Sequence, residues 1–123
     1  MYTYFIADDE TKIRQGLRRL IDWETLGFSF IGEASNGEDA LRFILDKNPD
    51  VALLDIRMPR LSGLDVARLA RADGYCGIII ILSGYSDFKY AQEAMRYDVK
   101  YYISKPVDED ELTDLSLIHI SEP

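Results

Sequence analysis

Five polar residues follow apolar stretches of the sequence and can do chemistry if they meet. They are Asp8, Asp9, Asp55, Ser83 and Lys105. In an open sheet of parallel strands, ligands bind outside the carboxyl ends of the strands, where these residues would lie. Each residue alone has an ordinary explanation as a helix cap, a turn residue or a solvated side chain. Their joint placement at one sheet edge is what predicts a site.

The three aspartates would repel one another if they met without a cation, so the pKa of at least one would rise. A hard divalent ion relieves this repulsion, and Mg²⁺, or Mn²⁺ in its place, prefers such oxygen ligands. With the metal bound, one carboxylate can attack phosphorus while the metal, Lys105 and backbone N–H groups neutralise the transferring oxygens. The predicted product is an aspartyl phosphate.

The elements that must position these residues alternate between strands and helices. Apolar stretches rich in β-forming residues predict strands at residues 2–7, 28–34, 51–54, 78–82 and 101–103. Helically spaced apolar residues predict helices around residues 13–21, 40–45, 66–70 and 88–95. A fifth helix is expected to begin near Asp108. Strict alternation implies parallel strands and right-handed crossovers, so we predict an α/β, doubly wound (βα)5 fold of three layers.

The composition predicts one soluble domain without nucleic-acid or lipid affinity. The chain has 123 residues, of which 47% are hydrophobic and 29% charged. Its net charge of −8 repels DNA and anionic lipid, and no apolar run approaches the ~18 residues of a membrane span. We therefore expect no direct DNA binding by this domain and no membrane association. A single cysteine, Cys76, and a start without secretory features predict a cytoplasmic location.

Four ordered motifs resemble those of two-component response-regulator receiver domains. They are ADDE at residues 7–10, LDIRMP at 54–59 followed by SG at 62–63, LSGY at 82–85, and KP at 105–106. The resemblance covers residues 1–114 and implies a flavodoxin-like sheet with strand order 2-1-3-4-5. It also implies a signalling domain that is not an enzyme, because a receiver catalyses only its own phosphorylation and dephosphorylation.

The resemblance implies an acceptor and a metal site. Asp55 matches the aspartate that a sensor histidine kinase phosphorylates. Asp8 and Asp9, together with Asp55 itself, match ligands of Mg²⁺. The backbone carbonyl of Arg57 matches a further ligand.

Four more residues match positions that respond to phosphorylation or support the site. Ser83 matches a switch hydroxyl that turns toward the phosphoryl group, and Lys105 matches a lysine that pairs with that group. Tyr102 matches an aromatic switch residue whose rotamer follows phosphorylation. Pro106 matches a proline whose preceding peptide is usually cis, an isomer that X-Pro bonds adopt at small cost.

Residues 21–28 and 83–91 resemble receivers that precede an AraC-type DNA-binding domain, which implies control of transcription by a full-length parent. The fourth helix, fifth strand and fifth helix form the face by which activated receivers commonly dimerise or contact an output. Aromatic residues gather there: Tyr85, Phe88, Tyr90, Tyr97, Tyr101 and Tyr102. Asp98 replaces a frequent helix-ending glycine, which predicts a stiffer or less stable turn.

Residues 115–123 resemble the in-frame translation of a sequencing-library adaptor. We therefore expect the receiver domain to span residues 1–114 and residues 115–123 to be a non-native tail that completes or replaces the last helix.

Three other interpretations are weaker. A flavodoxin-like cofactor binder needs Ser, Thr and Gly after its first strand, where Asp8 and Asp9 would repel a phosphate without metal. A metal-dependent phosphatase with an aspartate nucleophile usually carries a second acid two residues later, where Arg57 stands. A receiver relative that only binds other proteins is disfavoured because all five site positions hold the expected residue types.

Overall fold

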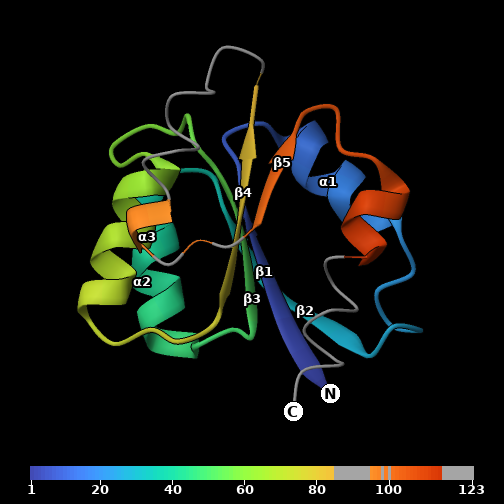
Figure 1. The fold of residues 1–123 in the computed structure, drawn as a ribbon, viewed down its shortest axis with the longest axis horizontal. Coiled ribbons are helices and arrows are strands. Elements are labelled where there is room, and N and C mark those ends of the chain that lie inside the picture. Colours follow the sequence, from blue (N-terminus) through green and yellow to red (C-terminus); the bar gives the residue numbers. More distant parts are fainter. Residues whose placement is uncertain (85–94, 98, 100, 115–123) are drawn as a thin grey trace.

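The computed structural model describes residues 1–84, 95–97, 99 and 101–114, and a five-stranded parallel sheet forms its centre (Figure 1). The strands are β1 (Tyr2–Ala7), β2 (Phe28–Ala34), β3 (Val51–Asp55), β4 (Ile78–Ser83) and β5 (Tyr101–Ser104). Their order is β2-β1-β3-β4-β5, and every neighbouring pair is parallel. The predicted fold class and strand order are confirmed.

Three strands continue one residue beyond their predicted ends. β3 includes Asp55, β4 includes Ser83 and β5 includes Ser104. The reason is pairing: Asp55 lies opposite Leu82, and Ser83 lies opposite Ser104, so these polar residues still have partner strands. The site residues at the ends of β3 and β4 therefore sit on ordered strand backbone.

The helices are α1 (Thr11–Leu20), α2 (Gly37–Lys47), α3 (Gly63–Ala72) and the 3-10 turn η2 (Met95–Tyr97). Side chains cap two of the helices at their start, α2 and α3. The Asp39 N–H donates to Asn36 Oδ1 over 2.8 Å at the start of α2. At the start of α3, Ser62 and Asp65 bond reciprocally in a capping box.

Residues 109–114 are helical, and the Leu112 N–H donates to the Asp108 carbonyl over 3.0 Å, which confirms a helix that begins near Asp108. Most of the predicted helix at 88–95 lies outside the described residues. So do Asp98 and residues 115–123.

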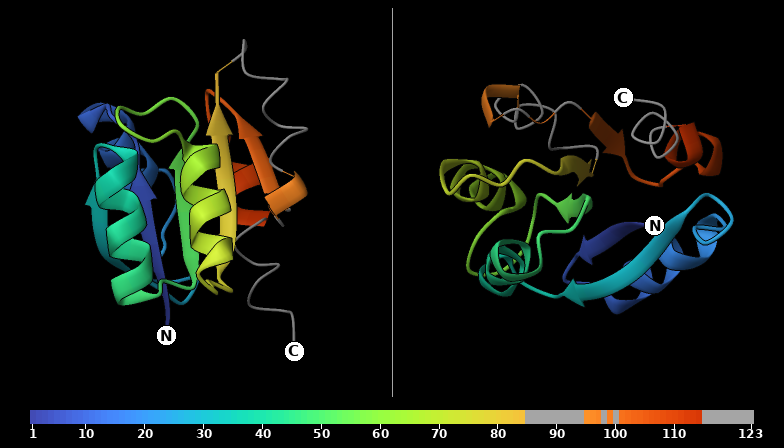
Figure 2. Two further views of the ribbon diagram at one scale, coloured as in Figure 1. Left: turned by 90° about the vertical axis from the view of Figure 1, so that its left-hand side faces the viewer. Right: turned by 90° about the horizontal axis from the view of Figure 1, so that it is seen from below.

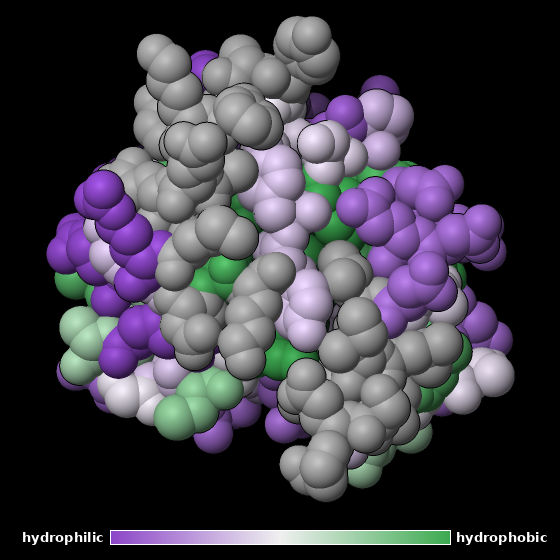
Figure 3. Space-filling view, in the orientation of Figure 1, coloured by the Kyte–Doolittle hydropathy of each residue, from purple (hydrophilic) through white to green (hydrophobic). Residues whose placement is uncertain are grey.

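Helices cover both faces of the sheet (Figures 1 and 2). α2 and α3 pack on one face over an apolar cluster that includes Phe5, Leu54 and Ile81. α1 and the 109–114 helix cover the other face, over a second cluster that includes Leu53 and Leu82. Hydrophilic side chains line both flanks of the molecule, and hydrophobic ones show in the recesses between them (Figure 3). None of the helices in the described ranges has the length and apolarity to cross a lipid bilayer.

A register shift divides β2 into two halves. Tyr4 of β1 lies opposite Phe30, but Phe5 lies opposite Gly32, so Ile31 is an extra residue in β2. Because side chains alternate between the faces of a sheet, the extra residue reverses the alternation. Glu33 consequently lies opposite Ile6 on the face that α1 covers.

Candidate functional site

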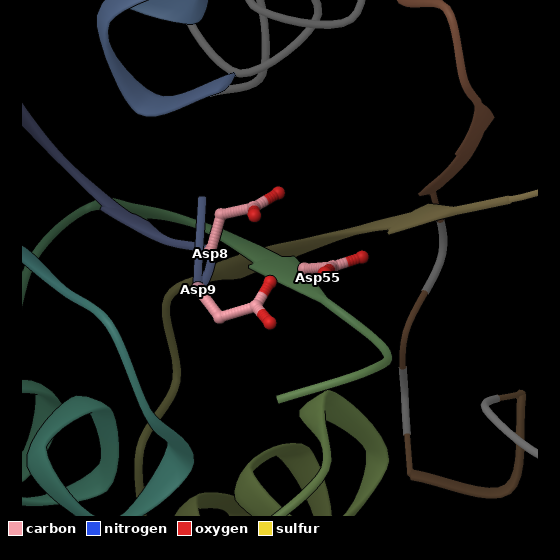
Figure 4. Close-up of side chains that lie close together, drawn as sticks. All are labelled: Asp8, Asp9 and Asp55. Atoms are coloured by element: carbon pink, nitrogen blue, oxygen red, sulfur yellow. The ribbon is translucent and has the colours of Figure 1, made fainter. Parts of the chain in front are cut away.

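Three carboxylates meet at the carboxyl edge of the sheet. Asp8 and Asp9 follow β1, Asp55 ends β3, and their side chains gather in one place (Figure 4). Each supplies a carboxylate oxygen that lies within 4.8 Å of the other two. Asp8 and Asp55 are buried, whereas Asp9 is exposed. The predicted meeting of these aspartates is therefore observed, and its exposed side faces solvent.

Backbone contacts hold the two buried aspartates. The Asp8 N–H donates to the Ala34 carbonyl over 3.1 Å, and Asp8 Oδ1 accepts from the Glu10 N–H at 2.9 Å. The start of α3 approaches Asp55 so closely that a Cβ on Gly63 would lie 2.3 Å from the Asp55 carbonyl oxygen. Only glycine fits there without a backbone shift.

Lys105 reaches the cluster from the loop after β5. Its Nζ lies 3.1 Å from Asp8 Oδ2 and 3.1 Å from Asp55 Oδ1. The Lys105 N–H donates to the Ser83 carbonyl over 2.8 Å, and the peptide to Pro106 is cis. One ammonium thus lies between two buried carboxylates, and the prediction of a cis peptide before Pro106 is confirmed.

Burial sets the electrostatics of the site. Burial, reinforced by the negative charge of Asp8, raises the pKa of Asp55 to about 6, although Lys105 acts in the opposite direction. Burial would by itself lower the pKa of Lys105, but hydrogen bonds and charge attraction from Asp8 and Asp55 outweigh it and raise that pKa. A carboxylate with a raised pKa beside a second carboxylate is what the sequence predicted for a cluster short of positive charge.

The donor set fits a hard divalent cation. Three carboxylates within reach of one another supply the oxygen ligands that Mg²⁺ prefers, and Mg²⁺ keeps several water molecules. Asp9 and Arg57 also line a cavity of about 650 Å³ beside the loop that follows β3. This open side leaves room for metal-bound water and for a phosphoryl group.

Ser83 and Tyr102 are joined through their hydroxyl groups, which hydrogen-bond each other. Ser83 is fully buried at the end of β4, and Tyr102 on β5 is half-buried against the apolar cluster under α2 and α3. The two predicted switch residues are therefore in contact. Of the other aromatic residues predicted for this face, Tyr97 and Tyr101 are half-buried, and Tyr85, Phe88 and Tyr90 lie outside the described residues.

Sequence reasoning missed Arg14, which touches the same turn. Arg14 on α1 is buried, and its Nη1 donates to the Asp8 carbonyl oxygen over 2.6 Å. A signal was present, because Arg14, Leu17 and Ile21 have the i, i+3, i+7 spacing of one buried helix face. An arginine on such a stripe predicts a buried guanidinium with a specific polar partner.

Sequence comparisons match most of the chain. Residues 4–116 match the response regulator receiver domain. The chain is 41% identical over 112 residues to the transcriptional regulatory protein YesN of Bacillus subtilis, covering 91% of this chain and 30% of that protein. It is 40% identical over 113 residues to the transcriptional regulatory protein HptR of Staphylococcus aureus, covering 91% of this chain and 44% of that protein. The chain thus spans less than half the length of these relatives.

Solved structures share the fold. The REC domain of AraT, a response regulator from Geobacillus stearothermophilus, is 37% identical with a TM-score of 0.89, and the match covers 96% of this chain and 92% of that one. A two component transcriptional regulator AraC from Clostridium phytofermentans is 33% identical with a TM-score of 0.82, covering 99% and 100%. Both likenesses extend over nearly the whole chain.

Proposed function

This chain belongs to the response regulator receiver domains of two-component signalling, and we propose that it accepts a phosphoryl group on Asp55 from a sensor histidine kinase. The observation that carries the proposal is the position of Asp55. It is a buried carboxylate beside two further aspartates and one lysine, and it lies next to an open cavity. This arrangement supports nucleophilic attack on phosphorus more directly than it supports cofactor binding.

Phosphoryl transfer forms one bond and breaks one. An Asp55 carboxylate oxygen attacks the phosphorus of a phosphohistidine, the P–N bond breaks, and its electron pair returns to the histidine nitrogen. Asp8, Asp9, Asp55 and the Arg57 carbonyl would hold Mg²⁺ or Mn²⁺, which supplies positive charge to the phosphoryl oxygens when bound. Asp55 must be ionised to attack, and its pKa of about 6 leaves it largely ionised at neutral pH.

Lys105 serves the reaction by changing partners. Its ammonium now bonds Asp8 and Asp55. Once Asp55 carries a phosphoryl group, Lys105 is within reach to pair with a phosphoryl oxygen, which stabilises the product by a charge-assisted bond. The raised pKa of Lys105 keeps it protonated for this role.

Ser83 and Tyr102 form the proposed switch. The Ser83 hydroxyl bonds Tyr102 in the unphosphorylated chain. If Ser83 turns toward a phosphoryl oxygen, Tyr102 loses that partner and is free to change rotamer, which alters the face near β5. Phosphorylation drives this change only as far as it favours one of the two states, and going from 1:99 to 99:1 takes about 5.5 kcal/mol.

The proposed partners follow from this switch. They are the sensor histidine kinase and a second copy of the domain, bound through the face of β5 and its flanking helices after phosphorylation.

We propose that the domain controls transcription through an output domain of a longer parent and makes no contact with DNA itself. Its only reactions would be its own phosphorylation and dephosphorylation. We also propose a cytoplasmic location, where histidine kinases draw on ATP, and a domain boundary near Asp114.

Intact mass spectrometry tests the acceptor. The protein is incubated with Mg²⁺ and acetyl phosphate, and wild type is compared with Asp55→Asn. Asp46→Asn is the matched control, because the Asp46 side chain is 70% exposed. We expect one phosphate adduct in wild type and in Asp46→Asn, none in Asp55→Asn, and none with EDTA. An adduct retained by Asp55→Asn would refute the assignment, and folded wild type without any adduct would favour a protein-binding module.

A further inference from the structure

Arg14 is a buried cation that joins the turn carrying Asp8 and Asp9 to the start of α1 and to Glu33 on β2. It is 9% exposed although α1 is otherwise largely solvated on its outer side. A buried guanidinium is costly unless charged or polar groups surround it. Its Nη1 donates to the Asp8 carbonyl over 2.6 Å, its Nη2 donates to Thr11 Oγ1 over 3.2 Å, and its Nε lies 3.3 Å from Glu33 Oε1.

The short bond to the Asp8 carbonyl constrains Asp9. The Asp8 carbonyl and the Asp9 nitrogen belong to one planar peptide unit. A hydrogen bond that holds the carbonyl oxygen therefore also holds the orientation of this peptide plane and the position of the Asp9 Cα. The Asp9 side chain is exposed, so its direction depends on the backbone rather than on packing. Arg14 thereby limits where the Asp9 carboxylate can stand relative to Asp8 and Asp55.

Glu33 holds Arg14 from the neighbouring strand. The extra residue Ile31 turns Glu33 toward α1, where it pairs with the Arg14 Nε. That Nε is the buried side-chain nitrogen that lacks a hydrogen bond in the described ranges, so the ion pair with Glu33 is what compensates its burial. The contacts thus run from β2 through α1 to the turn after β1.

We infer that Arg14 is a positioning residue that orients the Asp8–Asp9 peptide for binding of the divalent cation. The inference rests on the proposed metal-dependent function, and it assigns Arg14 no contact with the metal or the phosphoryl group. Partners that orient metal ligands typically contribute 10–100-fold to metal affinity. The planar fork of arginine bonds two groups at once, whereas a lysine ammonium keeps the charge without the fork.

Isothermal titration with Mg²⁺ tests the inference on wild type, Arg14→Lys and Arg14→Met, each checked for folding by circular dichroism. Arg42→Lys is the matched control, because Arg42 is exposed on α2. We expect the Mg²⁺ dissociation constant to rise about 10-fold or more in both Arg14 variants and to stay unchanged in Arg42→Lys. If Arg14 acted only through its charge, Arg14→Met would instead bind Mg²⁺ more tightly, which would overturn the inference.

A second readout separates positioning from chemistry. At saturating Mg²⁺ the rate of phosphorylation by acetyl phosphate should return to within about twofold of wild type in Arg14→Lys, because the ligands themselves are intact. Should the Arg14 variants fail to fold, Glu33→Gln is tested instead. This variant keeps Arg14 but removes the charge that pairs with its Nε, and we expect about a threefold loss of Mg²⁺ affinity.

The outcomes distinguish this inference from the proposed function. Wild type that does not bind Mg²⁺ would refute the metal site and the inference together. Wild type that binds Mg²⁺ while Arg14→Lys or Glu33→Gln binds equally well would overturn the inference and leave the proposed function standing.

Discussion

Replacing Asp55 by asparagine should stabilise the metal-free protein, because the fold keeps a charge where burial disfavours it. The pKa of Asp55 rises from 3.8 to about 6 on folding, first through burial and then through the charge of Asp8. Each tenfold change in an acid constant corresponds to about 1.4 kcal/mol, so keeping Asp55 ionised at neutral pH costs about 3 kcal/mol. Asparagine has the same shape without the charge, and its amide oxygen still accepts from Lys105.

The difference in folding stability between Asp55→Asn and wild type should depend on pH. Between about pH 4 and pH 6 the folded wild type binds more protons at Asp55 than the unfolded chain, so this residue lowers wild-type stability as the pH rises through that window. The advantage of Asp55→Asn should therefore be about 3 kcal/mol at pH 7.5 and about half that at pH 5. Saturating Mg²⁺ should narrow the gap, because a bound cation stabilises the wild-type carboxylate.

Urea unfolding in EDTA, followed by the fluorescence of Trp23, measures this difference. Trp23 is buried and stacks on Tyr4 with ring centroids 4.0 Å apart, so its emission should report unfolding. A gain of about 3 kcal/mol moves the urea midpoint by about 1–3 M. Asp46→Asn is the control and should match wild type at both pH values. Equal stability of Asp55→Asn and wild type, or a difference that is the same at both pH values, would refute the idea that the buried Asp55 charge destabilises the fold.

Two further predictions concern Lys105 and a pair of glycines, Gly63 beside the acceptor and Gly16 on α1. Lys105→Gln leaves the carboxylates of Asp8 and Asp55 buried without their cation. Urea unfolding in EDTA at pH 7.5 should therefore show a free energy of unfolding lower by about 3 kcal/mol, and added Mg²⁺ should recover part of this loss. An unchanged urea midpoint would contradict the pairing of Lys105 with the two carboxylates. Gly63→Ala should lower the free energy of unfolding by about 2 kcal/mol and slow acetyl-phosphate labelling, because its Cβ would press on the Asp55 backbone. Gly16→Ala, which meets nothing within 4 Å on α1, should instead raise thermal stability by about 0.5–1 kcal/mol. Melting curves of the two alanine variants that shift in the same direction would count against this contrast.

The strands and the main site residues could be predicted because their signals are local. The apolar runs at 51–54 and 78–82 have no polar interruption, which suits strands that are covered on both faces. The polar residues directly after such runs must lie at the carboxyl edge, so the meeting of Asp8, Asp9 and Asp55 follows from topology. The structure confirms that meeting, and the functional roles remain proposals.

Contacts that depend on exact register could not be predicted. The ion pair of Arg14 with Glu33 requires the extra residue in β2. The local signal is Gly32, because a lone glycine inside a strand suggests a bulge or a close backbone approach, but it does not fix the register. The contact of Lys105 with both Asp8 and Asp55 could not be predicted from the sequence either, because it depends on how the loop after β5 passes over the end of the sheet. Lys105 was expected to meet a phosphoryl group, and its present partners are the carboxylates.

The extra residue in β2 places the two halves of this edge strand under different selective demands. Phe28 and Phe30, before Ile31, serve the apolar layer beneath α1, and substitutions there are limited by volume. Glu33, after it, serves an electrostatic contact on the same side, and substitutions there are limited by charge. Regular pairing of the same residues without the bulge would set Glu33 opposite Ala7 and turn it toward the opposite layer, whereas deleting Ile31 would leave Glu33 opposite Ile6. A one-residue gap in β2 is therefore compatible with the Arg14 support of the acidic turn, and the arrangement that loses it is a β2 of the same length with regular pairing.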